Sequence, residues 1–453
     1  MSEVKVNKIS PRTNCGTVTL GDSGDTITIP AGVTVTNNGT QTGFGRTGTV
    51  NWNTTAKTTS FTAASGEGYF VNTTSGAITV TLPASPSAGD IVGVKDYAST
   101  FANNNCTIGR NSSLINGASQ DAVLSNNTQS LFLVYVDGTK GWIPTQDDTS
   151  NIGAEFISAT GGTVVTEGDF KYHTFTGPGT FCVSAAGNSQ GSNKIQYLVV
   201  AGGGSGAGQN CNGCGRHGGG GGAGGYRCSE TGLCAAVQAY SIAVGGGGAG
   251  NAYPANNGSN STFSTITSAG GGRGGGGDDT PKAGGPGGSG GGTGRGMPTS
   301  CVGAGNTPPV SPPQGNPGAA ATPPASNPQT NGGGGGAGAA ATPKNGAVAS
   351  PGGDGKNTLS AWASATSTGD NGYYAGGGGG GAHGTPTSPA YFGAGGAGGG
   401  GNGGAANADN PGESATANTG GGGGGGTTVG GSGACQAGGA GGSGIVILKY
   451  KFQ

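Results

Sequence analysis

The stretch HGGGGGAGGYR, residues 217–227, is either a slack tether or an ordered structural element. A flexible linker is the usual interpretation of glycine-rich sequence. Glycine loses more backbone entropy on ordering than any other residue, about 1–2 kcal/mol each, so order requires many compensating interactions. Polyglycine helices of the polyproline II type supply such interactions when they lie side by side, because they have no internal hydrogen bonds and every N–H and C=O is free to bond a neighbour.

The surrounding sequence favours the ordered alternative. Glycine runs of comparable length recur near residues 218, 245, 271, 333, 376, 398 and 420, as a bundle requires and a linker does not. A run such as 218–225 would extend roughly 25 Å at ~3.1 Å per residue. The last apolar segment, Ile445 to Tyr450, resembles KIQYLVV at 194–200 in length and character. We expect the two to pair in one sheet, so that the glycine region leaves this root and returns to it.

Composition restricts the partners of the chain. It has 110 glycines among 453 residues, 19 Lys and Arg against 20 Asp and Glu, and a formal net charge of -1. We expect no nucleic-acid partner, because binding a polyanion requires a basic surface. Charged residues make up only 9% of the chain, against about 25% in a typical soluble domain, which favours an extracellular or virion-exposed structure.

The start of the chain, MSEVKVNKIS, has no apolar segment behind a basic start, and no apolar run approaches the ~20 residues of a membrane helix. We therefore expect neither a visible export signal nor membrane insertion.

The strand and turn pattern predicts an all-β chain in three parts. Residues 1–45 are expected to form short-stranded β-structure that attaches and oligomerises, and residues 46–148 a compact β-domain. Residues 149–453 are expected to form a glycine-rich domain, with a β root at 149–200 and 445–452 and a polyglycine II bundle with loops at 201–444. The expected core of the β-domain consists of Leu82, Ile91, Val94, Phe132, Tyr135 and Trp142.

Several segments together resemble a known family. HTFTGPGTFCVS, YLVVAGGGSGAG, GGGGGAGGYR, YSIAVGGGGAG and SGIVILKYKF look like the glycine-rich domain of tailed-bacteriophage tail fibres and adhesins. GYFVNTTSGAITVTLPASPSAGDIVGVKDYA, with VYVDGTKGW, is similar to a β-domain of fibre proteins from marine phages and cyanophages. The resemblance implies a virion appendage made in the host cytoplasm and usually trimeric. Its N-terminus would attach to other tail or fibre proteins, and its bundle would present loops to a host surface glycan or protein.

A cysteine-rich loop, CNGCGRHGGGGGAGGYRC, departs from this family pattern. Cys211, Cys214, Cys228 and Cys234 include a C-x2-C spacing that could begin a tetrahedral zinc site, with His217 as a spare ligand. Disulfides and unpaired thiols are the alternatives, and the sequence leaves all three open. Because the chain has nine cysteines, at least one is free or bonded outside the chain.

The sequence favours no enzymatic chemistry and no cofactor. Gly202, Gly204 and Ala207 fit a dinucleotide fingerprint, but that fingerprint needs a following helix, which QNCNGCGRHGGGGG does not predict. The three histidines lie far apart in sequence, and no Ser/His/Asp or paired-carboxylate arrangement stands out.

Two polar loops are the candidate receptor-binding site. SAWASATSTGDNGYYAGG and AHGTPTSPAYFGAGG carry rings suited to stacking on sugars or packing into a protein receptor. The alternative is that these rings cap the edges of the bundle. The candidate residues are Trp362, Tyr373, Tyr374, His383, Tyr391 and Phe392.

We therefore expect a receptor-binding virion fibre or adhesin. One alternative is a purely structural virion appendage, such as a head fibre or decoration protein. A cell's own extracellular glycine-rich protein is another, which the lack of a visible export signal disfavours.

Overall fold

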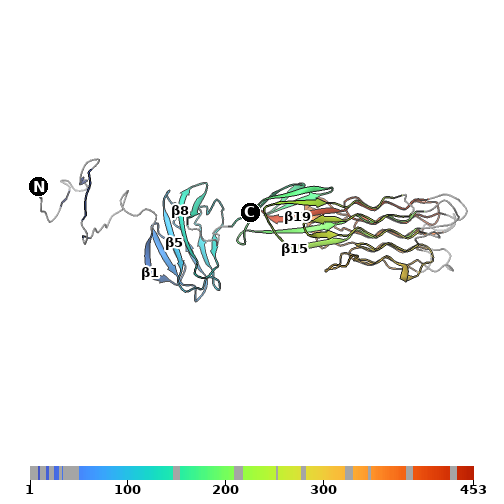
Figure 1. Cartoon of the computed structure of the whole chain (residues 1–453), viewed down its shortest axis with the longest axis horizontal. Helices are drawn as coiled ribbons and strands as arrows, with labels where there is room; N and C mark the ends of the chain where they lie inside the picture. The colour runs from blue at the N-terminus through green and yellow to red at the C-terminus, as the bar shows by residue number, and fades with distance from the viewer. Residues whose placement is uncertain are drawn as a thin grey trace.

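The computed structural model describes residues 50–145, 154–208, 218–250, 254–276, 282–321, 330–344, 348–383, 391–428 and 436–453, with short pieces of the first 49 residues. The fold is all-β, as predicted, and Figure 1 shows a β-domain followed by a sandwich that continues into a bundle of extended runs. The predicted β-structure of residues 1–45 lies almost entirely outside the described residues. In the part of the chain that the structure describes, no helix has the length and apolar character needed to cross a membrane.

The β-domain at 50–145 is a coil of two sheets. Successive strands from β1 to β6 alternate between the sheets, and neighbours such as β1 and β3, or β2 and β4, are parallel. The antiparallel strands β7, β8 and β9 complete the two sheets. One sheet has the order β1 (Asn51–Lys57), β3 (Glu67–Val71), β5 (Ile91–Asp96), β8 (Ser130–Asp137) and β9 (Gly141–Pro144). The other has β2 (Phe61–Thr62), β4 (Ile78–Thr81), β6 (Cys106–Gly109) and β7 (Ala122–Leu124).

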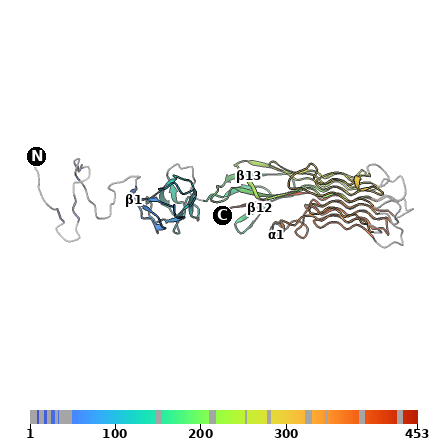
Figure 2. The same ribbon diagram turned by 90° about the horizontal axis from the view of Figure 1, so that it is seen from below.

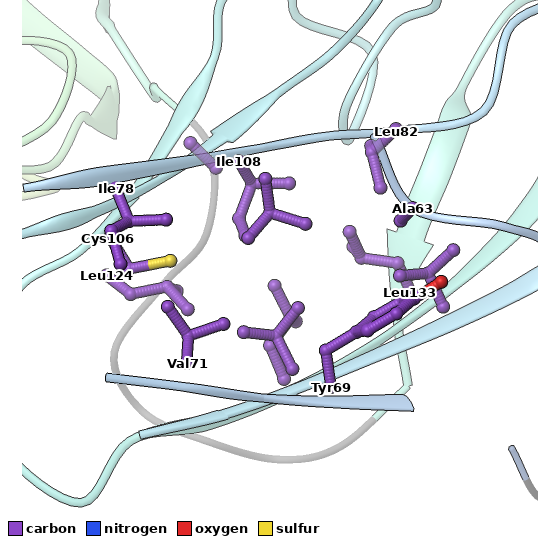
Figure 3. Close-up of a cluster of buried hydrophobic side chains, with 14 of the residues drawn as sticks. Ala63, Tyr69, Val71, Ile78, Leu82, Cys106, Ile108, Leu124 and Leu133 are labelled. Atoms are coloured by element: carbon purple, nitrogen blue, oxygen red, sulfur yellow. The ribbon is translucent and has the colours of Figure 1, made fainter. Parts of the chain in front are cut away.

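Three of the predicted core residues are fully buried between these sheets. Leu82, Val94 and Trp142 are buried, and Figure 3 shows part of this apolar cluster, Leu82 included. Tyr135 is half-buried at its edge and meets the Trp142 ring edge-on at 5.6 Å.

Two predicted core residues lie instead on the outer face of the five-stranded sheet. Ile91 and Phe132 are only half-buried, and Phe132 packs edge-on against Trp52 with 5.8 Å between ring centroids. Side chains along a strand alternate between faces, and the inward positions are taken by Val92 and Leu133. The prediction that Ile91 and Phe132 are core residues was therefore wrong.

The root of the glycine-rich part is a sandwich of two five-stranded sheets. One has the order β10 (Ile157–Thr160), β13 (Gly179–Ala186), β16 (Ala239–Ala243), β17 (Ser261–Phe263) and β18 (Ile266–Ser268). The other has β11 (Thr163–Glu167), β12 (Phe170–Phe175), β19 (Ile445–Lys451), β14 (Lys194–Val200) and β15 (Tyr226–Cys234). The root is thus larger than predicted, because four strands between residues 226 and 268 belong to it.

The predicted return of the chain to its root is confirmed. Strand β19 pairs antiparallel with β14, with Val200 opposite Ile445, and it also pairs with β12. Residues 197–200 of β14 and 445–448 of β19 are apolar on both faces because each face is covered. Side chains such as Val199 and Leu448 face the other sheet, whereas Leu198 and Ile447 join a second cluster where the sandwich meets the bundle. We call this second cluster, which also contains Tyr172, Trp362 and Tyr374, the junction cluster.

Run 218–225 lies at the centre of the bundle and has a hydrogen-bonding period of three. The N–H groups of Gly221, Gly222 and Ala223 donate to the carbonyls of Gly423, Gly272 and Gly335, at 2.8, 2.7 and 3.0 Å. Three residues after Gly221, the Gly224 N–H donates to Gly420, in the same neighbouring run as Gly423. The same run accepts bonds from three further runs, through the N–H groups of Gly204, Gly292 and Gly378. Six neighbours around a run with three residues per turn are the arrangement of polyglycine II.

This packing requires glycine because the runs meet backbone to backbone. A Cβ at Gly221 would lie 2.1 Å from the carbonyl oxygen of Gly204, and one at Gly220 would lie 2.1 Å from that of Gly378. Strands of the root lead directly into runs, as β14 does at Gly202 and β18 at Gly270. Within the described residues, the bundle region also contains the short helices η1 (Thr299–Cys301) and α1 (Ser360–Thr366).

Candidate functional site

The structure separates the six candidate receptor-binding residues into two groups. Trp362 belongs to α1, and Tyr373 and Tyr374 directly precede run 375–382 at its root end; Figure 2 shows α1 next to the sandwich. His383, Tyr391 and Phe392 belong to the opposite end, where Ala382 and Thr330 form a β-bridge. We call this opposite end, away from the sandwich, the far end. Eight polyproline II residues span ~25 Å, so the six residues do not form one site. The residues of the first group are Trp362, Tyr373 and Tyr374; those of the second are His383, Tyr391 and Phe392.

Trp362 and Tyr374 are parts of the junction cluster. Their exposed fractions are 2% and 0%. Trp362 meets Tyr172 of β12 edge-on with 6.0 Å between centroids, and the Lys449 ammonium lies 5.4 Å from the Trp362 ring. The Tyr374 hydroxyl is 2.6 Å from the hydroxyl of Thr368. Both rings therefore hold the bundle to the sandwich, which corrects their assignment as exposed receptor contacts.

Tyr373 is half-buried in a tight turn beside this cluster. Its N–H and C=O both bond the backbone of Asp370 at 2.9 Å. The Asp370 carboxylate in turn accepts the N–H of Gly399 at 3.0 Å. The turn is thus fixed to the neighbouring run, and Tyr373 stays a candidate contact at the root end.

At the far end, two of the three candidate residues are half-buried. Tyr391 packs against a small cluster of alanines that includes Ala382 and Ala406, and its carbonyl accepts the Ala406 N–H at 2.8 Å. Burial lowers the pKa of His383, and the positive charge of Arg295 acts in the same direction. Both causes favour the neutral form of His383.

Phe392 is the exposed ring of this group, with an exposed fraction of 40%. It lies at a pocket of about 380 Å³ near the far end, within the ~300–1,000 Å³ range of ligand sites. We call this the Phe392 pocket. It is lined by Phe392, Asn402, Gly403, Gly404, Ala405, Asn410, Pro411 and Glu413.

Two polar side chains of the Phe392 pocket hold each other in place. The Asn402 carboxamide accepts the Gly395 N–H and donates to a Glu413 carboxylate oxygen, both at 2.8 Å. The Asn402 carbonyl also accepts the Glu413 N–H at 2.8 Å. Sequence reasoning missed Asn402, Asn410 and Glu413, although the signal was present as polar residues that interrupt glycine and alanine in GGGGNGGAANADNPGES, residues 398–414.

Two of the four cysteines considered for a metal site are described. Cys228 and Cys234 lie on the same strand, β15, paired with Leu198 and Lys194 respectively. Their partners on β14 are four residues apart, about 13 Å along a strand, so these two cysteines do not ligate one ion together. Of the three alternatives left open by the sequence, a zinc site that includes both Cys228 and Cys234 is therefore ruled out. Both are free thiols, and no group of three or more His, Cys, Asp or Glu able to hold a metal occurs among the described residues. Cys211, Cys214 and His217 lie outside those residues.

The apparent dinucleotide fingerprint belongs to the bundle. Gly202, Gly204 and Ala207 are buried, and their N–H groups donate to the carbonyls of Ser259, Gly222 and Gly219 at 2.9–3.1 Å. A pyrophosphate would need these same donors, which the neighbouring runs already occupy.

These features define a class of protein in which a β-sandwich anchors a polyglycine II bundle. A family model described as a glycine-rich domain matches residues 176–451, more than half of the chain. The chain therefore belongs to the glycine-rich domain family. No curated protein sequence matches the chain.

Proposed function

We propose that the chain is a tail fibre or adhesin component of a virion, and that it recognises a host-cell receptor through the far end of its bundle. The observation that carries this proposal is the Phe392 pocket on a bundle fixed by interlocked backbone hydrogen bonds. A rigid scaffold with an exposed ring and fixed polar groups at one end suits recognition better than chemistry. The proposal includes no enzymatic activity and no cofactor, with synthesis in the host cytoplasm and a final location on the virion.

The proposed assembly is a homotrimer attached through its N-terminus to other tail or fibre proteins. Support comes from the described pieces of the first 49 residues, where Ile9, Ile27 and Val33 are about 60% exposed in the single chain, at 61%, 60% and 58%. Apolar side chains spaced along a thin segment gain burial when copies wind together. The mass of the full chain in solution tests this, since a monomer at micromolar concentration would contradict it.

A purely structural virion appendage is the second candidate. The burial of Trp362 and Tyr374 favours it, because it shows that large rings in the bundle region also serve the fold. A head fibre or decoration protein would need the rigid bundle but no receptor site.

Binding to cells separates the two candidates. The full chain, fluorescently labelled, is added to bacterial strains that the encoding virus infects and to resistant strains. Saturable binding to susceptible strains, with blocked adsorption of the virus, is the expected result. Labelling of the particles by an antibody against the chain, with no binding to any susceptible strain, would replace receptor recognition by the structural role.

A further inference from the structure

We infer that the Phe392 pocket binds an uncharged pyranose sugar. This inference rests on the proposed function, because it assigns a chemical class to the receptor that the far end would recognise. Its first support is the exposed ring of Phe392 in the lining, since the C–H groups on one face of a pyranose ring stack on aromatic rings.

The polar groups of the pocket suit sugar hydroxyls. A hydroxyl both donates and accepts, so it is matched by carboxamides, which do the same, and by a carboxylate, which accepts. The pocket supplies the carboxamides of Asn402 and Asn410 and the carboxylate of Glu413. The bond from Asn402 to Glu413 uses one carboxylate oxygen, which leaves acceptor capacity for a ligand.

Hydrogen bonds hold the Asn402 side chain and the Asn410 backbone before any ligand arrives. Asn402 is held by Gly395 on one side and by Glu413 on the other. The carbonyl of Asn410 accepts the Thr427 N–H at 3.0 Å, which ties its backbone to the neighbouring run that ends at Thr428. A fixed site loses little side-chain entropy on binding, which matters for a small polar ligand with few contacts.

The wall of the pocket is bare backbone because the bundle requires it. A Cβ at Gly403 would lie 2.1 Å from the Gly380 carbonyl oxygen, and one at Gly404 would lie 2.5 Å from that of Asn410. Both positions therefore remain glycine whatever the ligand is, and specificity falls to Phe392, Asn402, Asn410 and Glu413.

Charge decides which sugars fit. Among the described residues, the lining contains the Glu413 carboxylate and no Lys, Arg or His. An acidic sugar or a phosphate would meet this carboxylate without a compensating cation, so a neutral sugar is favoured. A lysine or arginine side chain of a protein receptor is disfavoured, because it only donates hydrogen bonds and would leave the N–H groups of the two carboxamides without an acceptor.

Saturation-transfer NMR on the full chain tests the inference. The probes are glucose, galactose, mannose and N-acetylglucosamine, with glucuronic acid, N-acetylneuraminic acid and a lysine peptide as comparisons. We expect at least one neutral sugar to bind saturably and neither acidic sugar to bind. Failure of every neutral sugar to bind, or equal binding of the acidic sugars, would overturn the inference.

Variants locate the site. Phe392→Ala is expected to weaken sugar binding about tenfold, the loss of a stacking ring, and Asn410→Ala to weaken it as well. Glu413→Gln keeps an acceptor for Asn402 and should retain binding within a few-fold. Tyr97→Ala, at a tyrosine that is 60% exposed in the β-domain, is the matched aromatic control and should change nothing. Sugar binding that Phe392→Ala and Asn410→Ala leave intact would place the sugar elsewhere and overturn the inference.

The same variants distinguish failure of the sugar site from failure of the proposed function. If wild type and Phe392→Ala bind susceptible cells equally, receptor recognition stands and the sugar pocket is wrong. If sugar binds but cells do not, the pocket stands and receptor recognition is wrong. If the lysine peptide binds and Glu413→Gln abolishes that binding, the pocket takes a protein side chain, and the inference is overturned.

Discussion

The β-domain and the bundle of this chain are stabilised by opposite parts of the polypeptide. In the β-domain, side chains such as Trp142, Leu82 and Val92 fill the space between two sheets, and all three are 0% exposed. In the bundle, Gly221 and its neighbours are equally buried, yet what they contribute is hydrogen bonds between backbones that touch. Burial therefore has two meanings here. In one region it measures apolar area removed from water, and in the other it measures how closely backbones approach.

The junction cluster, where both kinds of packing meet, gives the largest expected effect. Trp362→Ala removes a ring that is 2% exposed and should lower the free energy of unfolding of the glycine-rich part by about 3–5 kcal/mol. Thermal unfolding measures the loss, and hydrogen exchange should place it near β12 and α1 rather than at the far end. Tyr373→Ala is the matched control, with a small effect because that ring is only half-buried. If hydrogen-exchange protection were lost uniformly along run 375–382, the side-chain packing of the junction cluster and the backbone packing of the bundle would not be separable.

A single methyl group should break the backbone packing. Gly221→Ala places a Cβ 2.1 Å from the Gly204 carbonyl oxygen, and we expect a loss of about 1–3 kcal/mol, as for other overpacked sites. Gly246→Ala is the control, because a Cβ there meets nothing within 4 Å, and it should change stability by less than about 1 kcal/mol. Urea unfolding compares the two. Equal effects would mean that glycine acts here only through chain entropy.

The positive charge of Lys449, beside rings of the junction cluster, should contribute less to the free energy of unfolding. The Lys449 ammonium lies 4.2 Å from the Phe170 ring and 5.4 Å from both the Tyr172 and Trp362 rings. Lys449→Met keeps the apolar stem and removes the charge, so we expect a loss of about 0.5–1 kcal/mol. Repeating the substitution in the Trp362→Ala background should give a smaller loss. Strict additivity would show that the charge and this ring do not interact.

The smallest expected effect on stability comes from His173 and occurs only at acidic pH. His173 is fully buried; its ring nitrogens lie 2.6 Å from the Gly161 carbonyl and 3.1 Å from the Tyr450 hydroxyl. Burial lowers the pKa of His173; the hydrogen bond to the Gly161 carbonyl opposes this shift, and the positive charge of Lys171 adds to it. The folded state thus favours neutral His173, so stability is complete above the ordinary pKa of 6.5 and falls as pH decreases through the lowered folded-state pKa.

Urea midpoints of the full chain between pH 7.5 and 5 measure this dependence. His173→Gln, which does not titrate, should flatten the curve in the transition of the glycine-rich part. A transition that responds to pH equally in wild type and in the variant would assign the dependence to other groups.

The organisation of the glycine-rich part was predictable because it depends on local pattern. Comparable glycine runs predicted a bundle, and the likeness of 194–200 to the closing apolar segment predicted that β14 and β19 pair. Both inferences needed only run length and alternation. The exposure of individual rings was not predictable in the same way. Trp362 and Tyr374 belong to a polar segment whose sequence predicts an exposed loop. They are buried only because β12 and β19 of the sandwich lie against them.

The Phe392 pocket shows the same limit. Phe392 was a candidate from sequence, but Asn402 and Glu413 were not, because they stand ten or more residues away in a glycine-rich segment. Their proximity follows from how neighbouring runs register in the bundle, where the Glu413 N–H bonds the Asn402 carbonyl. No local pattern encodes that register.

The sequence by itself determined that the chain is all-β, that its glycine runs are ordered and that the glycine-rich region as a whole leaves one sheet and returns to it. These properties follow from strand alternation and from the absence of Cβ atoms, which any short segment carries within itself. The tertiary structure alone decided which rings are buried, which end of each run faces the sandwich and which polar groups meet at the Phe392 pocket. Those properties depend on contacts between segments far apart in the chain, and composition and spacing do not specify such contacts.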